Sequence, residues 1–181
     1  MNRRTAVRNI VIISAGTSLL PACTSADKPS LQLKNLSVTG PEEKMLAELA
    51  ETIIPGTSNF IGAKDLKSHE FLLTMIDDCA SPEDQKSFTN DMKAFEQTCQ
   101  KKYDNPFEKC TALQKSLLLK EMETVKDEKD PVNGHAAKFY KTVKRYTIQS
   151  FTSSKQYLLD VKKWKMVPGS DFKGCVPLPK I

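Results

Sequence analysis

Apolar residues along most of the chain recur every three or four positions, the spacing that gathers them on one face of an α-helix. Residues 41–54 show this pattern first, with a proline and two acids in the opening turn and with Pro55-Gly56 as a stop signal. Ser81-Pro82 is a second strong helix start. The apolar stripes of the five predicted helices are Leu46, Leu49, Ala50, Ile53 and Ile54; Leu66, Phe71, Leu72, Met75, Ile76 and Cys79; Phe88, Met92, Phe95 and Cys99; Leu113, Leu117, Leu118, Met122 and Val125; and Ala136, Tyr140, Val143, Thr147 and Phe151.

No segment alternates apolar and polar residues for long, so no strands are expected. We therefore predict an all-α protein: one small domain of about five helices. After about Leu159 the helical spacing ends, and prolines and glycines punctuate an apolar sequence from Trp164 onward. An extended C-terminal tail of this composition needs a surface to lie on. That surface is either the protein's own helices or a second protein, and the sequence leaves both possibilities open.

The first 22 residues have the pattern of an export signal. Arg3 and Arg4 precede an apolar run from Ile10 to Leu20, and no acidic residue occurs before Cys23. Paired arginines before a mildly hydrophobic run favour the twin-arginine route, which carries proteins that have already folded. The run is shorter than the roughly 20 residues that span a bilayer, so we do not expect a stable transmembrane helix. Folded export is needed chiefly by proteins that acquire a cofactor, or a partner that bears one, inside the cell.

Leu20-Pro21-Ala22-Cys23 resembles a bacterial lipobox, in which the cysteine is acylated and becomes the first mature residue. Acylation at Cys23 would supply the several lipid chains that stable membrane anchoring requires. The alternative is cleavage near Ala22 or Ala26, which would leave a soluble periplasmic protein. The expected organisation is a signal peptide at 1–22, a tether at 23–40 and a helical domain at 41–181, in the bacterial periplasm.

Charge argues against a nucleic-acid partner. Arg3, Arg4 and Arg8 are three of the 27 basic residues, so the chain after the signal carries 24 basic and 22 acidic residues. That balance, and the mixing of lysines with acids on the predicted helices, is typical of a solvated surface. The 159 residues left after residue 22 suffice for one domain with its own core.

Four cysteines remain beyond Cys23: Cys79, Cys99, Cys110 and Cys175. An exported chain meets an oxidising compartment, so an even number favours disulfides. Three connectivities are possible. We favour Cys99 with Cys110, across a turn between helices, and Cys79 with Cys175, which would tie the tail to the core.

The chain lacks the motifs of known catalytic and cofactor sites, including a nucleophile elbow, a Gly-rich phosphate loop and a dinucleotide fingerprint. Asp77 and Asp78 are adjacent, and consecutive helical residues point about 100° apart, which argues against a shared-proton pair. His69 could serve as a general base, but a hydrogen-bonded structural histidine is the commoner case. His69 and His135 lie far apart and no Cys-x-x-Cys occurs, so no metal site is expected. We predict no catalytic, cofactor-binding or metal-binding residue in this chain.

The chain carries four further motifs: Ala50-Glu51-Thr52-Ile53-Ile54-Pro55; Gly62-Ala63-Lys64-Asp65, running on to His69-Glu70-Phe71 and Asp77-Asp78-Cys79; Thr147 to Ser153; and Val167-Pro168-Gly169 followed by Gly174-Cys175-Val176-Pro177-Leu178. In this order, and behind an export signal, they resemble the gluconate 2-dehydrogenase subunit 3 family. Members of that family are small subunits of membrane-associated flavin dehydrogenases that oxidise sugars and sugar acids.

The resemblance implies an accessory role. In such complexes a large flavoprotein of the glucose-methanol-choline oxidoreductase type binds FAD and performs the oxidation. The small subunit supplies the twin-arginine signal, supports folding of the large one and accompanies it across the membrane. Electrons then pass to a cytochrome c subunit or to quinone. On this basis the chain is not an enzyme, holds no cofactor itself and has a flavoprotein partner.

Family motifs that combine with exposed apolar loops mark the expected partner interface. These residues are Pro55, Gly56, Phe151, Thr152, Ser153, Trp164, Pro168, Gly169, Val176, Pro177 and Leu178. The competing hypothesis is a free-standing, lipid-anchored helical binding protein that has no dehydrogenase partner. A third, that the chain is an enzyme using His69 with Asp77 or Asp78, has the least support.

Overall fold

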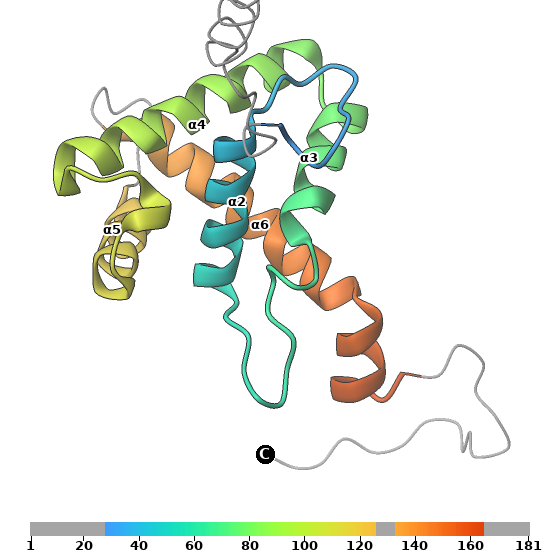
Figure 1. Cartoon of the computed structure of the whole chain (residues 1–181). Coiled ribbons are helices and arrows are strands. Elements are labelled where there is room, and N and C mark those ends of the chain that lie inside the picture. Colours follow the sequence, from blue (N-terminus) through green and yellow to red (C-terminus); the bar gives the residue numbers. More distant parts are fainter. Residues whose placement is uncertain (1–27, 126–132, 165–181) are drawn as a thin grey trace, which may run out of the picture.

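The structure, a computed structural model, describes residues 28–125 and 133–164 (Figure 1). The described part contains five α-helices and two short helical turns and no strand, which confirms the predicted all-α class. None of these helices has the length and apolar character needed to cross a membrane. In chain order the elements are α2 (Gly40–Ile53), α3 (Ser68–Cys79), α4 (Pro82–Tyr103), the 3-10 turn η2 (Phe107–Lys109), α5 (Ala112–Thr124), α6 (Gly134–Ser153) and the π-helical turn η3 (Tyr157–Val161).

Helix boundaries follow local signals that the sequence displays. At the start of α2, the Thr39 side chain accepts the Glu42 N–H while the Glu42 carboxylate accepts the Thr39 N–H, a reciprocal capping box. Ser81 caps α4 and Pro82 occupies its first turn, as predicted. Helix α4 ends at Tyr103, and the φ of 54° at its C-cap, Asp104, lies in the left-handed region.

Helix α6 lies at the centre of the bundle and packs against α2, α3, α4 and α5 (Figure 1). The predicted stripe along α6 is confirmed for its first four members, which are all buried. Phe151, the fifth member, is only partly buried because it lies where α6 extends beyond the other helices. The buried residues of α6 are Gly134, Ala136, Ala137, Phe139, Tyr140, Val143 and Thr147.

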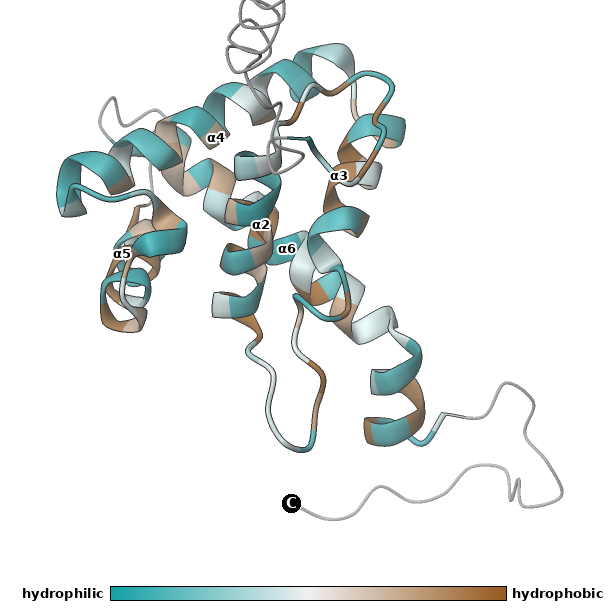
Figure 2. Cartoon of the chain, viewed as in Figure 1, coloured by the Kyte–Doolittle hydropathy of each residue, from teal (hydrophilic) through white to brown (hydrophobic). Residues whose placement is uncertain are grey.

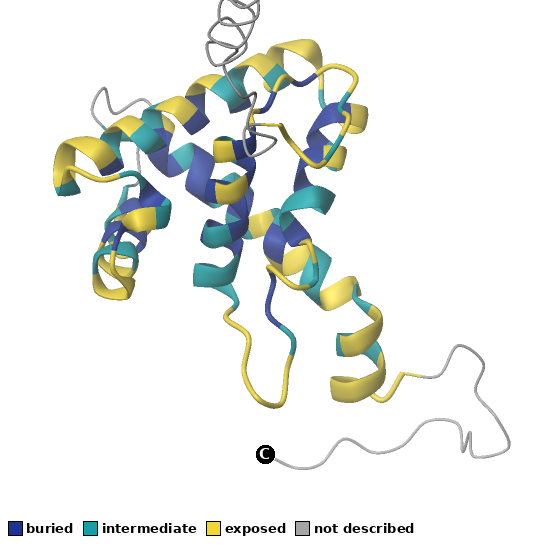
Figure 3. Cartoon of the chain, in the orientation of Figure 1, coloured by how far each residue is buried: buried dark blue, intermediate teal, exposed yellow. Residues whose placement is uncertain are grey.

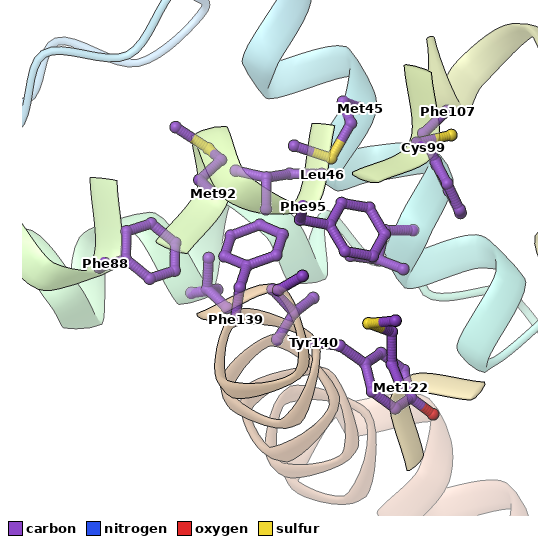
Figure 4. Packing of buried hydrophobic residues seen from close by; sticks show 14 of the residues in the cluster. Met45, Leu46, Phe88, Met92, Phe95, Cys99, Phe107, Met122, Phe139 and Tyr140 are labelled. Carbon is purple, nitrogen blue, oxygen red and sulfur yellow. The ribbon is translucent and has the colours of Figure 1, made fainter. Parts of the chain in front are cut away.

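Four phenylalanines form the middle of the core where α4 meets α6 (Figure 4). The Phe95 ring lies 5.3 Å from Phe139 and 5.4 Å from Phe107, and Phe88 lies 5.4 Å from Phe139. All three pairs are tilted, the arrangement that the quadrupoles of aromatic rings favour. The predicted stripe of α4 is thus confirmed as core.

Helix α5 presents only part of its predicted stripe to the core. Leu113 and Leu117 are 70% and 49% exposed, whereas Leu118, Leu119 and Met122 are buried. The prediction was wrong for Leu113 and Leu117 because α5 carries hydrophobic residues on more than one side (Figure 2). With three consecutive leucines, periodicity does not choose a face, and packing against α6 and α2 does.

Residues 28–39 pack onto the helices instead of forming a free tether. Leu36 and Val38 belong to the buried core. The Asp77 carboxylate accepts the backbone N–H groups of Lys34 at 2.8 Å and of Asn35 and Leu36 at 2.7 Å each. These bonds, the one from Lys34 first, hold the pKa of Asp77 below its usual value. The described part of the predicted tether is therefore part of the folded domain.

Candidate functional site

The connection between α2 and α3 is a folded loop built around the carboxylate of Glu51. The Gly56 N–H donates to Glu51 Oε1 at 2.7 Å, and the Lys64 N–H donates to Oε2 at 3.0 Å. The Ala63 N–H donates to the Ile54 carbonyl at 3.0 Å and closes the base of the loop. One acidic side chain from the last turn of α2 thus holds both sides of the loop.

Gly62 is required by the close approach of the two sides. A Cβ atom at this position would lie 2.5 Å from Glu51 Oε2 and 2.6 Å from the backbone nitrogen of Gly56. Both separations are shorter than side-chain carbons tolerate, so glycine alone fits without opening the loop. The motif that begins with Ala50-Glu51 and the one that begins with Gly62 are therefore two halves of one loop structure.

The tip of this loop is a tight turn that presents an aromatic ring to solvent. The Thr57 N–H donates to the Phe60 carbonyl at 2.8 Å, and the Phe60 N–H donates to Thr57 Oγ1 at 3.1 Å. Phe60 remains 48% exposed, and Pro55 is also exposed. The loop is held by its own hydrogen bonds while its apolar groups stay uncovered.

The last turns of α6 and the η3 turn form a second exposed segment. The Phe151 ring packs at 5.4 Å against Tyr157, and the Trp164 N–H donates to the Leu158 carbonyl at 2.8 Å. These contacts fold the chain back on itself after α6. Trp164 is nevertheless 47% exposed.

We use the term loop end for the loop of residues 54–67 together with residues 148–164. Both segments project at the lower end of Figure 1, and most of their residues are exposed in Figure 3. In the part of the chain that the structure describes, five of the seven exposed large apolar residues lie in the loop end, and the other two, Leu113 and Leu117, lie on α5. Exposed apolar side chains that are concentrated at one end of a domain are typical of a site that binds another macromolecule. The five are Phe60, Ile148, Leu159, Val161 and Trp164.

The predicted interface residues that the structure describes lie in the loop end. Pro55, Gly56 and Trp164 are exposed. Thr152 and Ser153 are exposed as well, but their hydroxyls donate to carbonyls of the preceding turn, Ile148 and Gln149, each at 2.8 Å, and so help to end the helix. The remaining predicted interface residues, Pro168, Gly169, Val176, Pro177 and Leu178, lie outside the described residues.

Sequence reasoning missed four exposed apolar residues of the loop end. Phe60 lies in a loop, and an apolar pair, Phe60-Ile61, between two glycines was the signal that could have identified it. Ile148 lies within a predicted helix, and Leu159 and Val161 lie where the helical spacing ends; apolar spacing alone does not show that no other helix covers this part of the chain.

The titratable candidates make structural contacts. Asp77 accepts the three N–H groups described above, while Asp78 pairs with the Lys34 ammonium at 3.3 Å, so the two adjacent carboxylates serve different partners. Burial lowers the pKa of His69. Burial, followed by the neighbouring Glu123 carboxylate, raises the pKa of Tyr140 to about 12, which suits a packing residue better than an acid catalyst.

Cys99 and Cys110 are both buried, and their sulfur atoms lie 3.5 Å apart. They are free thiols in the structure, and burial raises the pKa of Cys99. Cys79 is exposed at the end of α3. The structure thus brings together one of the two predicted pairs, and its oxidation stays a prediction. The pairing of Cys79 with Cys175 also stays a prediction, because Cys175 lies outside the described residues.

The features predicted for the N-terminus, Arg3 and Arg4 of the export signal and the lipidated Cys23, also lie outside the described residues. Neither a curated protein nor a solved structure matches the chain. The family model for gluconate 2-dehydrogenase subunit 3 matches residues 41–169, which include every described helix except the first residue of α2. The match extends from the capped start of α2 through both segments of the loop end, and the chain therefore belongs to the gluconate 2-dehydrogenase subunit 3 family.

Proposed function

We propose that this protein is a non-catalytic accessory subunit that binds a large, FAD-containing sugar or sugar-acid dehydrogenase of the glucose-methanol-choline type through its loop end. The observation that carries the proposal is the exposure of Phe60, Ile148, Leu159, Val161 and Trp164 in two segments that project at the same end of a member of a dehydrogenase-subunit family. Apolar groups in that arrangement gain free energy when a partner removes them from water.

The construction of the loop end suits a stable interface. The Glu51 hydrogen bonds order the loop before any partner arrives, so binding costs little conformational entropy there. Phe60 and Trp164 are large rings with few rotatable bonds, the kind of residue that dominates the binding energy of many interfaces. A surface with these properties fits a partner with apolar pockets.

Export of a folded pair follows from the same proposal. The twin-arginine signal with Arg3 and Arg4 would carry the small subunit and its bound flavoprotein together into the periplasm, and acylation of Cys23 would anchor the pair to the membrane. Support comes from the basic, acid-free N-terminus and from a compact helical domain able to bind before export.

The oxidation itself is assigned to the partner, whose FAD would accept the electrons and pass them to a cytochrome c subunit or to quinone. Asp77 and Asp78 are the adjacent carboxylates of this chain that could suggest an acid–base site. Both bind Lys34 and so hold the segment 28–39, which supports a structural role for them. The small subunit would act by binding and escorting.

Co-purification tests the interface. An affinity-tagged full chain expressed in its native host should retain a yellow, flavin-containing protein. Exchange of both Phe60 and Trp164 for serine should release it, because two exposed anchors are lost while the core is untouched. The matched control exchanges Leu113 and Leu117, which are at least as exposed but lie on α5, and should retain the flavoprotein. Retention by the first variant, or release by the control, would place the interface elsewhere.

Fractionation tests the escort role. Replacement of Arg3 and Arg4 by lysines should leave both chains in the cytoplasm, since the twin-arginine route reads the arginine pair. Appearance of the flavoprotein in the periplasm of that variant would show that it travels without this subunit. Mass spectrometry of the mature N-terminus then decides whether Cys23 is acylated.

A further inference from the structure

Three side chains of the kind that binds metal ions meet where α2 and α3 lie side by side (Figure 1). Glu43 comes from the first turn of α2, and His69 and Glu70 come from the first turn of α3. Their potential ligand atoms all lie within 4.8 Å of one another, and this is the one such group among residues 28–125 and 133–164. The sequence did not reveal it, because Glu43 is far from the other two along the chain.

One nitrogen of the His69 imidazole has no hydrogen-bond partner among the described residues. Its side chain is only 11% exposed, and Nδ1 is shielded from solvent without a partner in the described part of the chain. Its other nitrogen, Nε2, lies 3.8 Å from Glu43 Oε1, too far for a hydrogen bond. The nitrogen that faces Glu43 is Nε2, so the contact that a shared ion would complete is this 3.8 Å separation, whereas the unpartnered Nδ1 lies on the other side of the ring and is suited to a water.

Glu43 is a buried carboxylate that meets the same site. It is 7% exposed, and both its oxygens accept hydrogen bonds from Ser30, one from the backbone N–H and one from the hydroxyl. Within 4.0 Å, the described residues offer it a single basic group, the His69 imidazole. Buried carboxylates are usually paired with a cation or coordinate a metal, and Glu43 has room for either.

The distances suit one shared ion. Two metal–ligand bonds of about 2.1 Å span at most about 4.2 Å, which covers the 3.8 Å between His69 Nε2 and Glu43 Oε1. Glu70 now pairs with Lys67 at 3.0 Å and is the most exposed of the three side chains, so it can turn inward to complete the set. A cavity of about 220 Å³, lined in part by Ser30, Glu43 and His69, leaves space for a coordinated water. Lys28 and Lys44 also line it, but both residues are exposed, so their ammonium groups can remain in solvent.

We propose that Glu43, His69 and Glu70 bind a divalent transition-metal ion, with zinc as the reference ion, which ties the first turns of α2 and α3 together. Zinc is bound by histidine nitrogens and by Asp or Glu oxygens, and three protein ligands with an open fourth position are common at zinc sites. Through the bonds from Ser30 to Glu43, the ion would also fasten the segment 28–39 to the domain. The site is independent of the dehydrogenase partner.

Calorimetric titration of zinc into the full chain, after chelator treatment, tests the site. We expect one ion per chain and, at about a hundredfold excess over Kd, a rise in melting temperature of roughly 5–10 °C. Glu70→Gln and His69→Asn should each weaken binding by about tenfold or more. Glu70 is partly exposed, so the Glu70→Gln variant should fold even if the His69→Asn variant does not. Circular dichroism in the absence of metal checks the folding of both variants.

Two matched controls exclude other zinc ligands. His135→Ala removes the exposed histidine that pairs with Asp91 at 2.5 Å, and Cys79→Ser removes the exposed thiol; both should bind zinc as the unaltered chain does. Cobalt should bind without a thiolate charge-transfer band. Equal binding by the Glu70→Gln variant, loss of binding in either control, or no rise in melting temperature would overturn the proposal, and would leave water as the partner of His69.

Discussion

Exchange of Gly62 for alanine tests how the loop end is built. The new Cβ would lie 2.5 Å and 2.7 Å from the two Glu51 oxygens and 2.6 Å from the Gly56 nitrogen. A side chain can move aside, but the Gly56 nitrogen belongs to the backbone, so the two sides of the loop must separate. Separation breaks the bond from Gly56 N–H to Glu51 or the bond from Lys64 N–H to Glu51.

The chain provides its own control in Gly56, which faces Gly62 across the loop. A Cβ at Gly56 would lie 3.2 Å from the Gly62 nitrogen, a contact that a shift of a few tenths of an ångström relieves. Insertion of a methyl group into tight packing costs about 1–3 kcal/mol, and replacing glycine returns about 0.4–1 kcal/mol by restricting the unfolded chain. We expect Gly62→Ala to lower the free energy of unfolding by about 1–2 kcal/mol, and Gly56→Ala to change it by less than about 0.5 kcal/mol.

Urea denaturation of the two variants measures this difference, with the free energy of unfolding taken at equal m-value. Glu51→Gln provides an independent check: an amide has one oxygen for the two N–H groups that the carboxylate serves, so a loss of about 1–2 kcal/mol is expected. The reasoning is refuted if Gly62→Ala is no more destabilising than Gly56→Ala. If Glu51→Gln is neutral, the carboxylate does not hold the loop.

Four further substitutions probe the rest of the fold. Asp77→Asn should speed amide hydrogen exchange at residues 34–36, because a single amide oxygen cannot accept three N–H groups; exchange as slow as in the unaltered chain would contradict the role given to Asp77. The pKa of Asp77 in the folded protein lies below its ordinary value of 3.8. The ionised Asp77 carboxylate therefore stabilises the fold fully above about pH 5, and this contribution is lost as the pH falls below 3.8 through the folded pKa. The difference in stability between the unaltered chain and Asp77→Asn should accordingly shrink on acidification. Phe95→Ala, which empties the space between Phe107 and Phe139, should cost about 3–5 kcal/mol in denaturant unfolding, and a loss below about 1 kcal/mol would disprove the aromatic core. On α5, Leu118→Ala should cost about 2–5 kcal/mol and Leu113→Ala less than about 0.5 kcal/mol; the reverse order would contradict the buried face that the structure gives to α5.

The family motifs gain a physical explanation in the structure. Glu51, Gly56 and Gly62 act together in one loop, although they stand apart in the sequence. Asp77 holds the segment that precedes α2, which explains an acid near the end of α3. These residues shape the domain and position the loop end. The proposed partner contacts come instead mainly from residues outside the α-helices, such as Phe60 and Trp164.

Local interactions let the sequence determine the helices. Caps such as Thr39 and Ser81 act within a few residues, and the apolar spacing of α4 and α6 admits one buried face, so the all-α class and most of the core follow without tertiary information. Family membership was also readable, because its motifs are continuous stretches.

Tertiary structure alone decided what depends on distant residues. The buried side of α5 was settled by packing against α6, because three consecutive leucines allow several faces. The attachment of residues 28–39 depends on Asp77, more than 40 positions away, and the meeting of Glu43 with His69 depends on how α2 and α3 pack. Periodicity reports which residues share a helix face, whereas the contact between two faces, and the exposure of a face that no helix covers, exist only once the chain has folded.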